Sequence, residues 1–349
     1  MKKILIIILT LLICTGCYDY KEINDLAIIS AIGVDYENDE YIITLEILND
    51  QIDKASSKIT SYTKTGSGKT LTSAIENAAD KLSKELIFNH IKLMILSKSI
   101  VETKFDNIID LFLRNTYFRE NFYVISSTDT KPEDLLNHTT NEAPIASTAI
   151  TDTLESISYS SNTNILKKFD EIVEEVITYG IDTCFSNITL KNDEFIVDGM
   201  AIFNNYDYIG NLDNEYVKIY NLLTDNFDRP TYTINYDNLS FTIAINNGKL
   251  NTEIKKGTIN VTGNLMGRII DNAPKYNIRD PKNLERIDND FTNLLNKKIP
   301  EFIKVLQDNN SDILGITRNY YKKTRTKDKD YWLKLDIKSN IKFNINKKG

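Results

Sequence analysis

Cysteine, histidine, glycine and proline are all scarce in this chain of 349 residues, and each scarcity excludes a class of protein. The sequence contains three cysteines, two histidines, 13 glycines and six prolines. So little glycine and proline excludes a fibrous or low-complexity chain. Three cysteines and two histidines are too few for a disulfide-rich scaffold or for the usual ligand sets of a zinc site, so we expect no metal.

The chain also lacks an apolar run long enough to cross a membrane as a helix. The run at residues 4–13 is interrupted only by Thr10, whereas a spanning helix needs about 20 residues. Its length is typical of the core of a signal peptide, and the two lysines before it form the positive start of such a segment. This segment therefore predicts export of the chain.

A cysteine follows this apolar run and suggests how the exported chain is held. Thr15 and Gly16 are small, and Cys17 comes directly after them. This arrangement resembles the bacterial lipobox, in which the thiol receives a diacylglycerol group and cleavage leaves the cysteine as the first residue. We therefore expect residues 1–16 to be removed and Cys17 to carry an S-diacylglycerol group and an N-acyl chain. Two acyl chains are sufficient for stable attachment to a membrane.

Two details leave alternatives open. The position three before Cys17 holds Cys14, where leucine is usual, and Cys14 cannot take the lipid itself because the bulky Ile13 precedes it. The chain could instead be an ordinary secreted protein with a chance cysteine, or it could keep its apolar segment as an uncleaved anchor. If Cys14 is removed and Cys17 is lipidated, Cys184 alone remains, which excludes an internal disulfide.

The composition predicts a folded, acidic body. Hydrophobic residues make up 41% and charged residues 26%, and 19 tyrosines with 14 phenylalanines supply large side chains for a core. The formal net charge is −7, which disfavours binding to nucleic acid and to anionic lipid. We therefore expect no nucleic-acid partner, and attachment to the extracytoplasmic face of the cell membrane through Cys17.

The apolar periodicity predicts strands and helices that alternate without a regular βαβ repeat. Alternation of apolar and polar residues predicts strands, and a spacing of three to four predicts helices. The expected strands are 26–35, 41–48, 91–97, 122–126, 184–190, 194–203, 231–236, 239–245, a partner strand from 249 after an Asn247-Gly248 turn, 257–270 and 341–345. Residues 49–68 are expected to be a loop or an edge strand. The expected helices are 70–86, 105–114, 131–136, part of 143–154, 165–179, 212–223 and 281–307, with Pro300 kinking or interrupting the last one.

This mixture indicates a multi-domain α+β fold with mixed or antiparallel sheets and packed helices. We divide the chain into a signal peptide at 1–16, an N-terminal α+β region at 17–195 and a C-terminal domain at 196–349. The C-terminal domain contains the long helix near 281–307 and the final strand. Residues 139–165 are rich in Ser, Thr and Asn, and we expect them to be loosely packed.

One segment resembles half of a phosphate-binding loop. Residues 65–70 read Thr-Gly-Ser-Gly-Lys-Thr before a predicted helix. The first glycine of the complete motif is replaced by Thr63, and residues 58–62 are too polar for the buried strand that normally precedes it. We therefore interpret the segment as a flexible turn in which Thr70 caps the helix, rather than as a nucleotide site.

The polar residues form no recognisable catalytic constellation. His90 and His138 are too few for a His-based metal site, and His90 is interpreted as a packing or hydrogen-bonding residue. Glu174-Glu175 are interpreted as a solvated face, because adjacent residues point in different directions on a helix. There is no Ser-His-Asp arrangement and no His-Glu-x-x-His motif. We therefore expect no catalytic residues and no cofactor.

Two acidic pairs and one basic stretch could bind ions or partners. Asp193-Glu194, and Asp328 with Asp330, could contact a divalent ion but lack the spacing of an EF-hand. The basic stretch at 322–329 could contact anionic lipid headgroups or an acidic partner, and its simpler interpretation is a solvated loop.

Several segments, taken in their order and spacing over nearly the whole chain, resemble the Ger(x)C family of spore germination lipoproteins. Tyr18 stands where that family usually has tryptophan. The segments are Gly16-Cys17-Tyr18-Asp19, Glu22-Ile23, Leu26-Ala27-Ile28, Gly33-Val34-Asp35, Ala74–Leu86, His90-Ile91-Lys92, Arg119-Glu120, Gly199-Met200-Ala201-Ile202-Phe203, Gly210-Asn211-Leu212, Leu306-Gln307 and Ser311-Asp312-Ile313-Leu314-Gly315.

The resemblance implies a role rather than a reaction. Such proteins are the lipoprotein C subunits of nutrient germinant receptors in the spore inner membrane, with a polytopic A subunit and a transporter-like B subunit as partners. It therefore implies a non-enzymatic subunit of several α+β domains that is needed for nutrient-triggered germination. The alternatives are a solute-binding lipoprotein of a transporter, which usually has two lobes with regular βα alternation, and a surface hydrolase.

Overall fold

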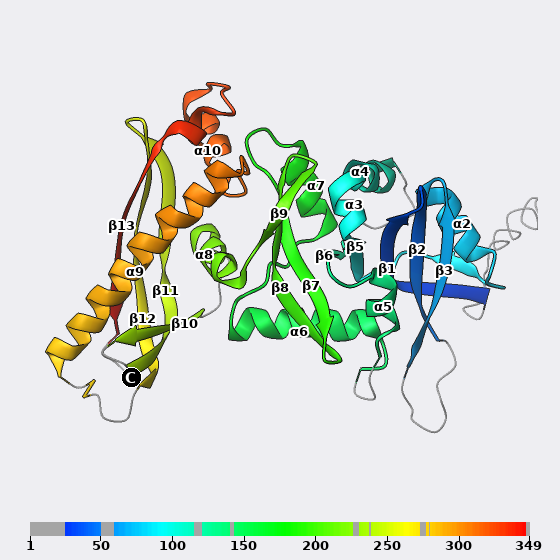
Figure 1. Ribbon diagram of the computed structural model, residues 1–349, viewed down its shortest axis with the longest axis horizontal. Helices are drawn as coiled ribbons and strands as arrows, with labels where there is room; N and C mark the ends of the chain where they lie inside the picture. Colours follow the sequence, from blue (N-terminus) through cyan, green and yellow to red (C-terminus); the bar gives the residue numbers. More distant parts are fainter. Residues whose placement is uncertain are drawn as a thin grey trace, which may run out of the picture.

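A computed structural model of the protein describes residues 25–49, 59–114, 121–139, 143–225, 230–236, 239–272, 277–278 and 280–346. The described strands form two sheets, one of nine strands and one of four. The two sheets lie toward opposite ends of an elongated molecule (Figure 1). The prediction of an α+β fold with mixed sheets is confirmed.

The first sheet is parallel at its centre and antiparallel at both sides. Strand β1 is parallel to β5 and to the short β4, and β5 is parallel to β6, whereas β1–β2–β3 and β7–β8–β9 are antiparallel meanders. The strand order is β3 (Ser61–Gly68), β2 (Glu40–Leu48), β1 (Leu26–Glu37), β5 (Leu93–Ser97), β6 (Tyr123–Ser127), β7 (Cys184–Lys191), β8 (Glu194–Asn204) and β9 (Asp207–Leu212), with β4 (Glu85–Ile87) beside β1.

Helices cover both faces of the central strands, which explains why β1 and β5 read as nearly continuous apolar runs. On β1, Ile32 and Val34 face one core and Ala31 faces the other. The first core contains α2 (Leu71–Ala79), α3 (Lys98–Thr103), α4 (Phe105–Arg114) and α7 (Phe169–Ile177). The opposite core contains α5 (Pro132–Asn137) and α6 (Ala146–Ser160).

Helix α2 packs directly on the edge strand β3. A Cβ atom on Gly66 would lie 2.4 Å from the backbone oxygen of Ala74 and from the backbone nitrogen of Ala78, so only glycine permits this approach. The prediction of a flexible turn at 65–68 is therefore wrong. Thr70 does cap the helix, because its hydroxyl accepts from the N–H of Ser73 at 3.1 Å, which confirms that prediction.

The predicted helix at 70–86 is too long. It ends at Ala79, and residues 85–87 form β4, where Leu86 pairs with Ala27 at the start of β1. Residues 82 and 86 continue the helical spacing of apolar side chains, but pairing with β1 satisfies the backbone there instead. Tertiary strand pairing thus overrides the local pattern.

The β7–β8 hairpin contributes to all three apolar cores. Phe185 packs in the first core, Ile188 in the core beneath α6, and Met200 in the core of the four-stranded sheet. Strand β8 crosses the division that we place at 195/196; that domain boundary stays a prediction.

The second sheet has the order β10 (Thr231–Tyr236), β11 (Leu239–Lys255), β12 (Thr258–Asn272) and β13 (Asp336–Ile345). The expected turn at Asn247-Gly248 is wrong: β11 continues through it with an irregularity between Ile245 and Asn247. Gly248 has φ +132° and lies against Asn264 of β12, so it serves a bulge. The hairpin turns instead at Lys256-Gly257, where both residues have positive φ, as a type I′ turn requires.

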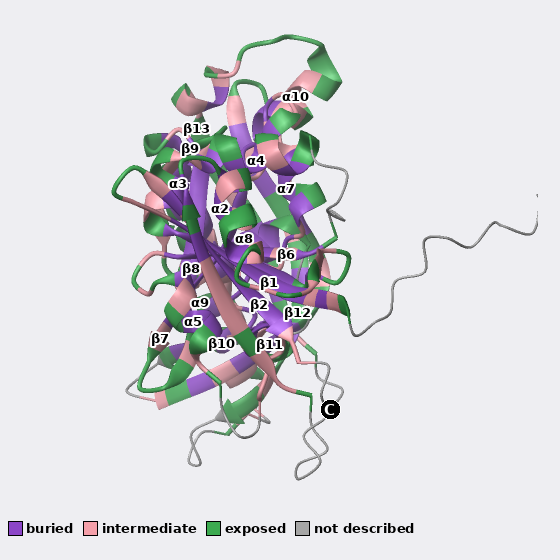
Figure 2. Cartoon of the chain, turned by 90° about the vertical axis from the view of Figure 1, so that its right-hand side faces the viewer, coloured by how far each residue is buried: buried purple, intermediate pink, exposed green. Residues whose placement is uncertain are grey.

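Helices cover only one face of this second sheet. They are α8 (Asn214–Thr224), α9 (Pro281–Asp308) and α10 (Ile316–Thr324), followed by the 3₁₀ turn η2 (Tyr331–Lys334). On β12, Thr262, Asn264 and Met266 are exposed on the opposite face. Buried residues follow the strands of the molecule, and α10 at its rim is mostly exposed or intermediate (Figure 2).

Polar side chains of α9 bond the free edge of β13. The N–H groups of Ile345, Phe343 and Ile341 donate to Asp288, Thr292 and Asn296 at 2.8, 3.1 and 2.9 Å. The bonded helix residues are four apart and the bonded strand residues two apart. Both spacings correspond to roughly 6 to 7 Å, so each helix side chain meets the next strand N–H. These bonds close an edge that could otherwise pair with another chain.

Other differences from the sequence predictions have local causes. Helix α9 is not interrupted at Pro300, where buried Ile299 and Phe302 hold the flanking turns in the core. The segment predicted to be loosely packed contains α6, with Ala146, Ile150 and Leu154 buried. The sequence patterns also missed β9 and α10, and residues 331–334, to which no element was assigned, form η2.

A buried carboxylate joins α6 to the edge of the first sheet. Glu46 of β2 is inaccessible to solvent. It accepts hydrogen bonds from the Ser30 and Ser61 hydroxyls at 2.7 and 2.8 Å, and from the N–H groups of Ala146 and Ser147 at 2.7 and 3.2 Å. Its negative charge lies at the positive end of α6.

We expect Glu46→Gln to lower the free energy of unfolding by about 2 to 4 kcal/mol, because one oxygen that accepts from donors becomes an NH₂ group that faces them. Urea unfolding measures the change. The matched control is Glu76→Gln, at an exposed position of α2, which should change stability by less than about 0.5 kcal/mol. Equal effects of the two substitutions would contradict the prediction.

Candidate functional site

A crevice lies at the carboxyl ends of the parallel strands β1, β5 and β6. The chain moves from β1 through β2 to β3 on one side and from β5 to β6 on the other, so the strand order reverses between β1 and β5. Ligands of open sheets with parallel strands bind preferentially at such a reversal. The cavity here has a volume of about 320 Å³. It is lined by Asp35, Tyr36, Glu37, Ser97, Lys98, Ser99, Glu102, Ser127, Thr128, Asp129, Thr130 and Lys131.

Asp35 is held rigidly in this cavity. Its side chain is 9% exposed, and its Oδ1 atom accepts from the Tyr36 N–H and the Ser99 hydroxyl, each at 2.8 Å. The Ser99 hydroxyl also bonds that of Ser97, which caps α3. Close packing against α5 also positions β1, the strand that carries Asp35. A Cβ atom on Gly33 of this strand would lie 2.8 Å from the Cβ of Pro132, so the two elements approach closely there.

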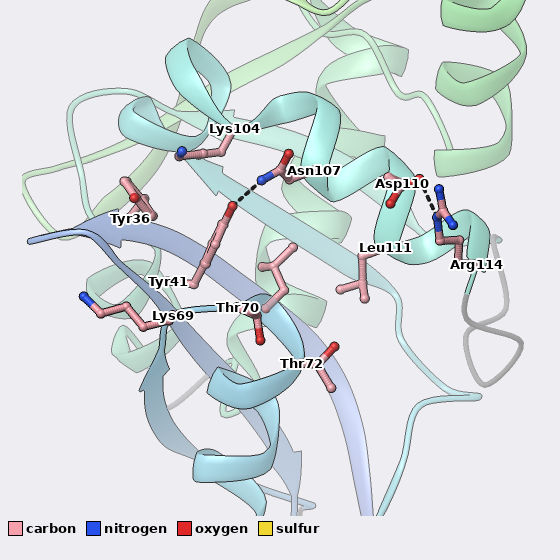
Figure 3. A pocket seen from close by; sticks show the side chains of 11 residues that line it. Tyr36, Tyr41, Lys69, Thr70, Thr72, Lys104, Asn107, Asp110, Leu111 and Arg114 are labelled. Atoms are coloured by element: carbon pink, nitrogen blue, oxygen red, sulfur yellow. Dashed lines mark hydrogen bonds and ion pairs between the residues drawn. The ribbon is translucent and has the colours of Figure 1, made fainter.

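A second, larger cavity of about 740 Å³ adjoins the first, and Tyr36 lines both. It lies between the start of α2 and helix α4 (Figure 3). The Tyr41 hydroxyl accepts from the Asn107 amide across it, and Arg114 bonds Asp110 at 2.7 Å along α4. The ammonium group of Lys104 lies 4.8 Å from the centre of the Tyr36 ring.

A second group of polar residues joins the two halves of the chain. The Asp182 carboxylate accepts from the N–H groups of Asp312 and Asn205 at 2.7 and 2.8 Å, and the Asp182 N–H donates to the Asp312 carbonyl at 3.1 Å. The Ser311 hydroxyl donates to the Phe203 carbonyl at 2.6 Å. The Arg318 N–H donates to the Gly180 carbonyl at 2.7 Å. The segment Ser311–Gly315 therefore holds the first sheet to the second.

Asp312 also caps α10. Its two oxygens accept from the N–H groups of Ile316 and Thr317 at 2.8 and 2.7 Å. Burial raises the pKa of the Asp312 carboxyl to about 6, and the nearby Asp182 charge acts in the same direction, although the hydrogen bonds from Thr317 and Ile316 oppose it.

The basic stretch 322–329 contacts this protein itself. Lys323 pairs with Glu253 at 2.6 Å. Lys329 donates to the Asn204 and Asn205 side chains at 3.0 and 2.9 Å and lies 3.8 Å from Asp182. Lys329 is therefore not a solvated loop residue and strengthens the connection between the sheets, whereas Lys323 is largely exposed and pairs within the half that contains the second sheet.

The Cys184 thiol is buried in a charged cluster. Lys167 bonds both oxygens of Glu175 at 2.7 and 2.6 Å and lies 3.6 Å from the sulfur, and the Thr183 hydroxyl donates to Glu175 at 2.7 Å. Burial raises the pKa of the Cys184 thiol, and the Lys167 charge offsets this only in part. A buried thiol with a raised pKa is a poor nucleophile, so we assign the cluster a structural role.

The histidines and paired carboxylates lie apart from one another. His90 is exposed between β4 and β5, so its interpretation as a packing residue is wrong. His138 bonds the Asp193 carbonyl through Nε2 at 2.9 Å and packs edge-on against Phe195. Glu174 is solvated and pairs with Arg318 at 3.2 Å, whereas its neighbour Glu175 is turned inward, contrary to the prediction.

The remaining candidates are exposed or not described. Asp193-Glu194 lie in the exposed β7–β8 turn, and Asp328 and Asp330 are exposed near η2. Cys17 lies outside the described residues, so its lipidation stays a prediction. In the parts of the chain that the structure describes, no three His, Cys, Asp or Glu side chains are placed to hold a metal ion. No helix in those parts combines the length and apolarity of a bilayer crossing.

The sequence reading gave no role to Asp35, Asp182 or Asp312. Asp35 and Asp312 stand in the segments Gly33-Val34-Asp35 and Ser311–Gly315, which were noted only for their resemblance to a family. The available signal was a charged residue that ends or interrupts an apolar run. Such a residue must find a partner when it is buried.

These features define a class: an α+β protein with two sheets held together by buried carboxylates and a shared hairpin. Residues 19–190 match the family described as "Spore germination protein N-terminal domain", and residues 198–349 match "Spore germination B3/ GerAC like, C-terminal". The chain belongs to this GerAC-like family of spore germination proteins, which confirms the resemblance noted in the sequence.

Individual relatives agree with this membership. Spore germination protein KC of Bacillus subtilis (strain 168) is 30% identical over 159 residues, which cover 43% of this chain and 39% of that protein. Spore germination protein A3 of the same organism is 28% identical over 209 residues, which cover 58% of this chain and 55% of that protein. The matched regions therefore span about two fifths and just over half of these two relatives.

A solved structure shows the shared fold. The crystal structure of the GerBC protein matches 90% of this chain and 96% of its own chain, with a TM-score of 0.54 and 15% sequence identity. At this identity the likeness concerns the fold alone, and it confirms the predicted fold class.

We expect the Asp312→Asn variant to show how stability depends on the Asp312 proton. An acid whose pKa is raised by folding stabilises the folded chain at low pH, and this contribution is lost as pH rises through about 6. The difference in unfolding free energy, variant minus wild type, should therefore shift in favour of the variant by up to about 3 kcal/mol between pH 4 and pH 7.

Urea unfolding at pH 4, 5, 6 and 7 measures this shift. Asp308→Asn, on the exposed last turn of α9, is the control and should give a difference that varies little with pH. A pH-independent difference for Asp312→Asn would mean that this carboxyl is not the titrating group.

Proposed function

We propose that this protein is the non-enzymatic lipoprotein subunit of a nutrient germinant receptor, anchored through Cys17 on the outer face of the spore inner membrane. The observation that carries the proposal is family membership in both halves of the chain. The lipobox-like segment that ends at Cys17 supports the anchor.

The geometry of the chain is compatible with such an anchor. Asp25, where the described structure begins, is eight positions after Cys17, and an extended chain of that length reaches at most about 28 Å. Strand β1 starts at the end of the molecule away from the four-stranded sheet (Figure 1). A lipid on Cys17 would therefore keep the first sheet near the membrane and leave the second sheet farther out.

The proposed partners are the membrane-embedded A and B subunits of the receptor. The alternative role, a solute-binding lipoprotein of a transporter, fits less well. Strands β7–β9 and β10–β12 are antiparallel meanders rather than the regular βα units of that class.

We expect Cys17→Ala to abolish lipid attachment. In native cells the wild-type protein should incorporate labelled palmitate and sediment with membranes, whereas the variant should do neither, because the acyl chains supply the attachment. Cys184→Ala removes the buried cysteine of the folded body and is the matched control, which should keep the label. Label on the Cys17→Ala protein would show that the anchor lies elsewhere.

Deletion of the gene in its spore former should reduce nutrient-triggered release of spore-core contents. The wild-type gene should restore the response, and the gene for the Cys17→Ala variant should restore less of it, because the subunit no longer concentrates at the membrane. Unchanged germination with every nutrient, in a strain without a second receptor, would overturn the proposed role.

A further inference from the structure

The two adjoining cavities at the strand ends carry residual charges of opposite sign. In the smaller cavity, Lys131 pairs with Glu37 at 2.7 Å and Lys98 with Glu102 at 3.8 Å. The carboxylates of Asp35 and Asp129 have no ion-pair partner among the described residues, although Lys131 is near enough for Asp35 to help raise the pKa of its ammonium, after the larger effect of Glu37. After pairing, this cavity keeps a negative charge.

The larger cavity keeps a positive charge. Arg114 pairs with Asp110 at 2.7 Å, and Lys69 lies 3.7 Å from Glu40. Within the described parts of the chain, Lys104 has no acidic partner and lies only against the ring of Tyr36. Tyr36 lines both cavities, so the ring against which this cation lies also borders the negative cavity.

Asp35 is prepared to bind a cation. Both hydrogen bonds that the described residues donate to it go to Oδ1, so Oδ2 is left for a ligand. Holding one oxygen in place fixes the direction of the other, which is the kind of support that a binding site requires. Hydroxyl groups of Ser97, Ser127 and Thr128 also line the cavity and can accept from an ammonium group.

A neighbouring tyrosine reports the same negative field. Burial raises the pKa of Tyr208 on β9 to about 12, and the carboxylates of Glu102 and Asp129 add to the shift. Both carboxylates line the smaller cavity. A negative field that disfavours a phenolate favours an ammonium ion.

We propose that this crevice binds a small zwitterionic molecule, with its ammonium group at Asp35 and its anionic group at Lys104. The reversal of strand order indicates where a ligand binds, and the opposite charges of the two cavities indicate that the ligand carries both charges. The proposal goes beyond the receptor role and does not depend on it, since binding is measured on the isolated chain.

Ligand-observed NMR titration of the intact chain tests the proposal. The probes are glycine, β-alanine, 4-aminobutyrate and 6-aminohexanoate, which separate the two charges by increasing lengths, with butylamine, butyrate, hexylamine and hexanoate as singly charged controls. At least one of the two longer zwitterions should bind at least tenfold more tightly than the amine and the acid of equal carbon number. If each of these two zwitterions binds no more tightly than its amine and its acid, the proposal is overturned.

Variants locate the site. Asp35→Asn keeps the Oδ1 acceptor and should weaken the best zwitterion by about tenfold or more, the effect expected for loss of a charged hydrogen bond. Lys104→Gln should weaken it as well, without a change in butylamine binding. The matched controls are Asp225→Asn and Lys249→Gln, an ion pair of 2.6 Å on the distant second sheet, and these should change nothing.

Folding is checked separately. Thermal unfolding of each variant shows whether the chain remains folded, and Asp129→Asn, at an exposed position, provides a second test should Asp35→Asn unfold. Zwitterion binding that is unchanged in both Asp129→Asn and Lys104→Gln would place the ligand elsewhere and overturn the proposal. Loss of binding with an intact germination response would separate this site from the receptor role.

Discussion

The two sheets form one molecule because side chains of the β7–β8 hairpin pack in the apolar cores of both sheets. Its alternating side chains enter three apolar cores, so neither sheet can move without disturbing the other. Asp182, just before β7, bonds the backbone of Asp312, which is 130 residues farther along the chain. The cap of α10 and the position of Lys329 depend on this junction.

Buried carboxylates recur as the means by which this acidic protein joins distant segments. Glu46 bonds the first turn of α6, Asp312 bonds the first turn of α10, and Asp182 bonds two backbone N–H groups. Burying a charge costs free energy unless hydrogen bonds compensate for it. Several donors meet each of these groups, so each stabilises one arrangement of segments that are far apart in sequence.

The described polar clusters consist largely of contacts within the chain, and the Cys184 thiol is buried. The crevice differs because its charges remain open to a ligand after the internal pairs are counted. A rigid body with one open polar crevice can respond to a small molecule without performing chemistry on it.

The sequence alone was sufficient for features that depend on local pattern. An apolar run located β1, alternation located β2, and helical spacing gave α4 with both ends correct. These succeed because strand and helix periodicity reflect which side of one element is buried. The order of short matching segments was enough to indicate the family, since it requires no knowledge of contacts.

Tertiary structure alone decided where long-range contacts override local preference. Asn247-Gly248 has the composition of a turn, yet pairing with β12 keeps β11 extended and moves the turn to Lys256-Gly257. Residues 85–87 leave the helical pattern because β1 offers them backbone partners. The crevice combines the ends of three strands that the chain visits at residues 35, 97 and 127, and no local pattern shows that they meet. Burial and pairing energies between distant segments exceed the fraction of a kcal/mol per residue that separates local conformations, so the fold decides such positions.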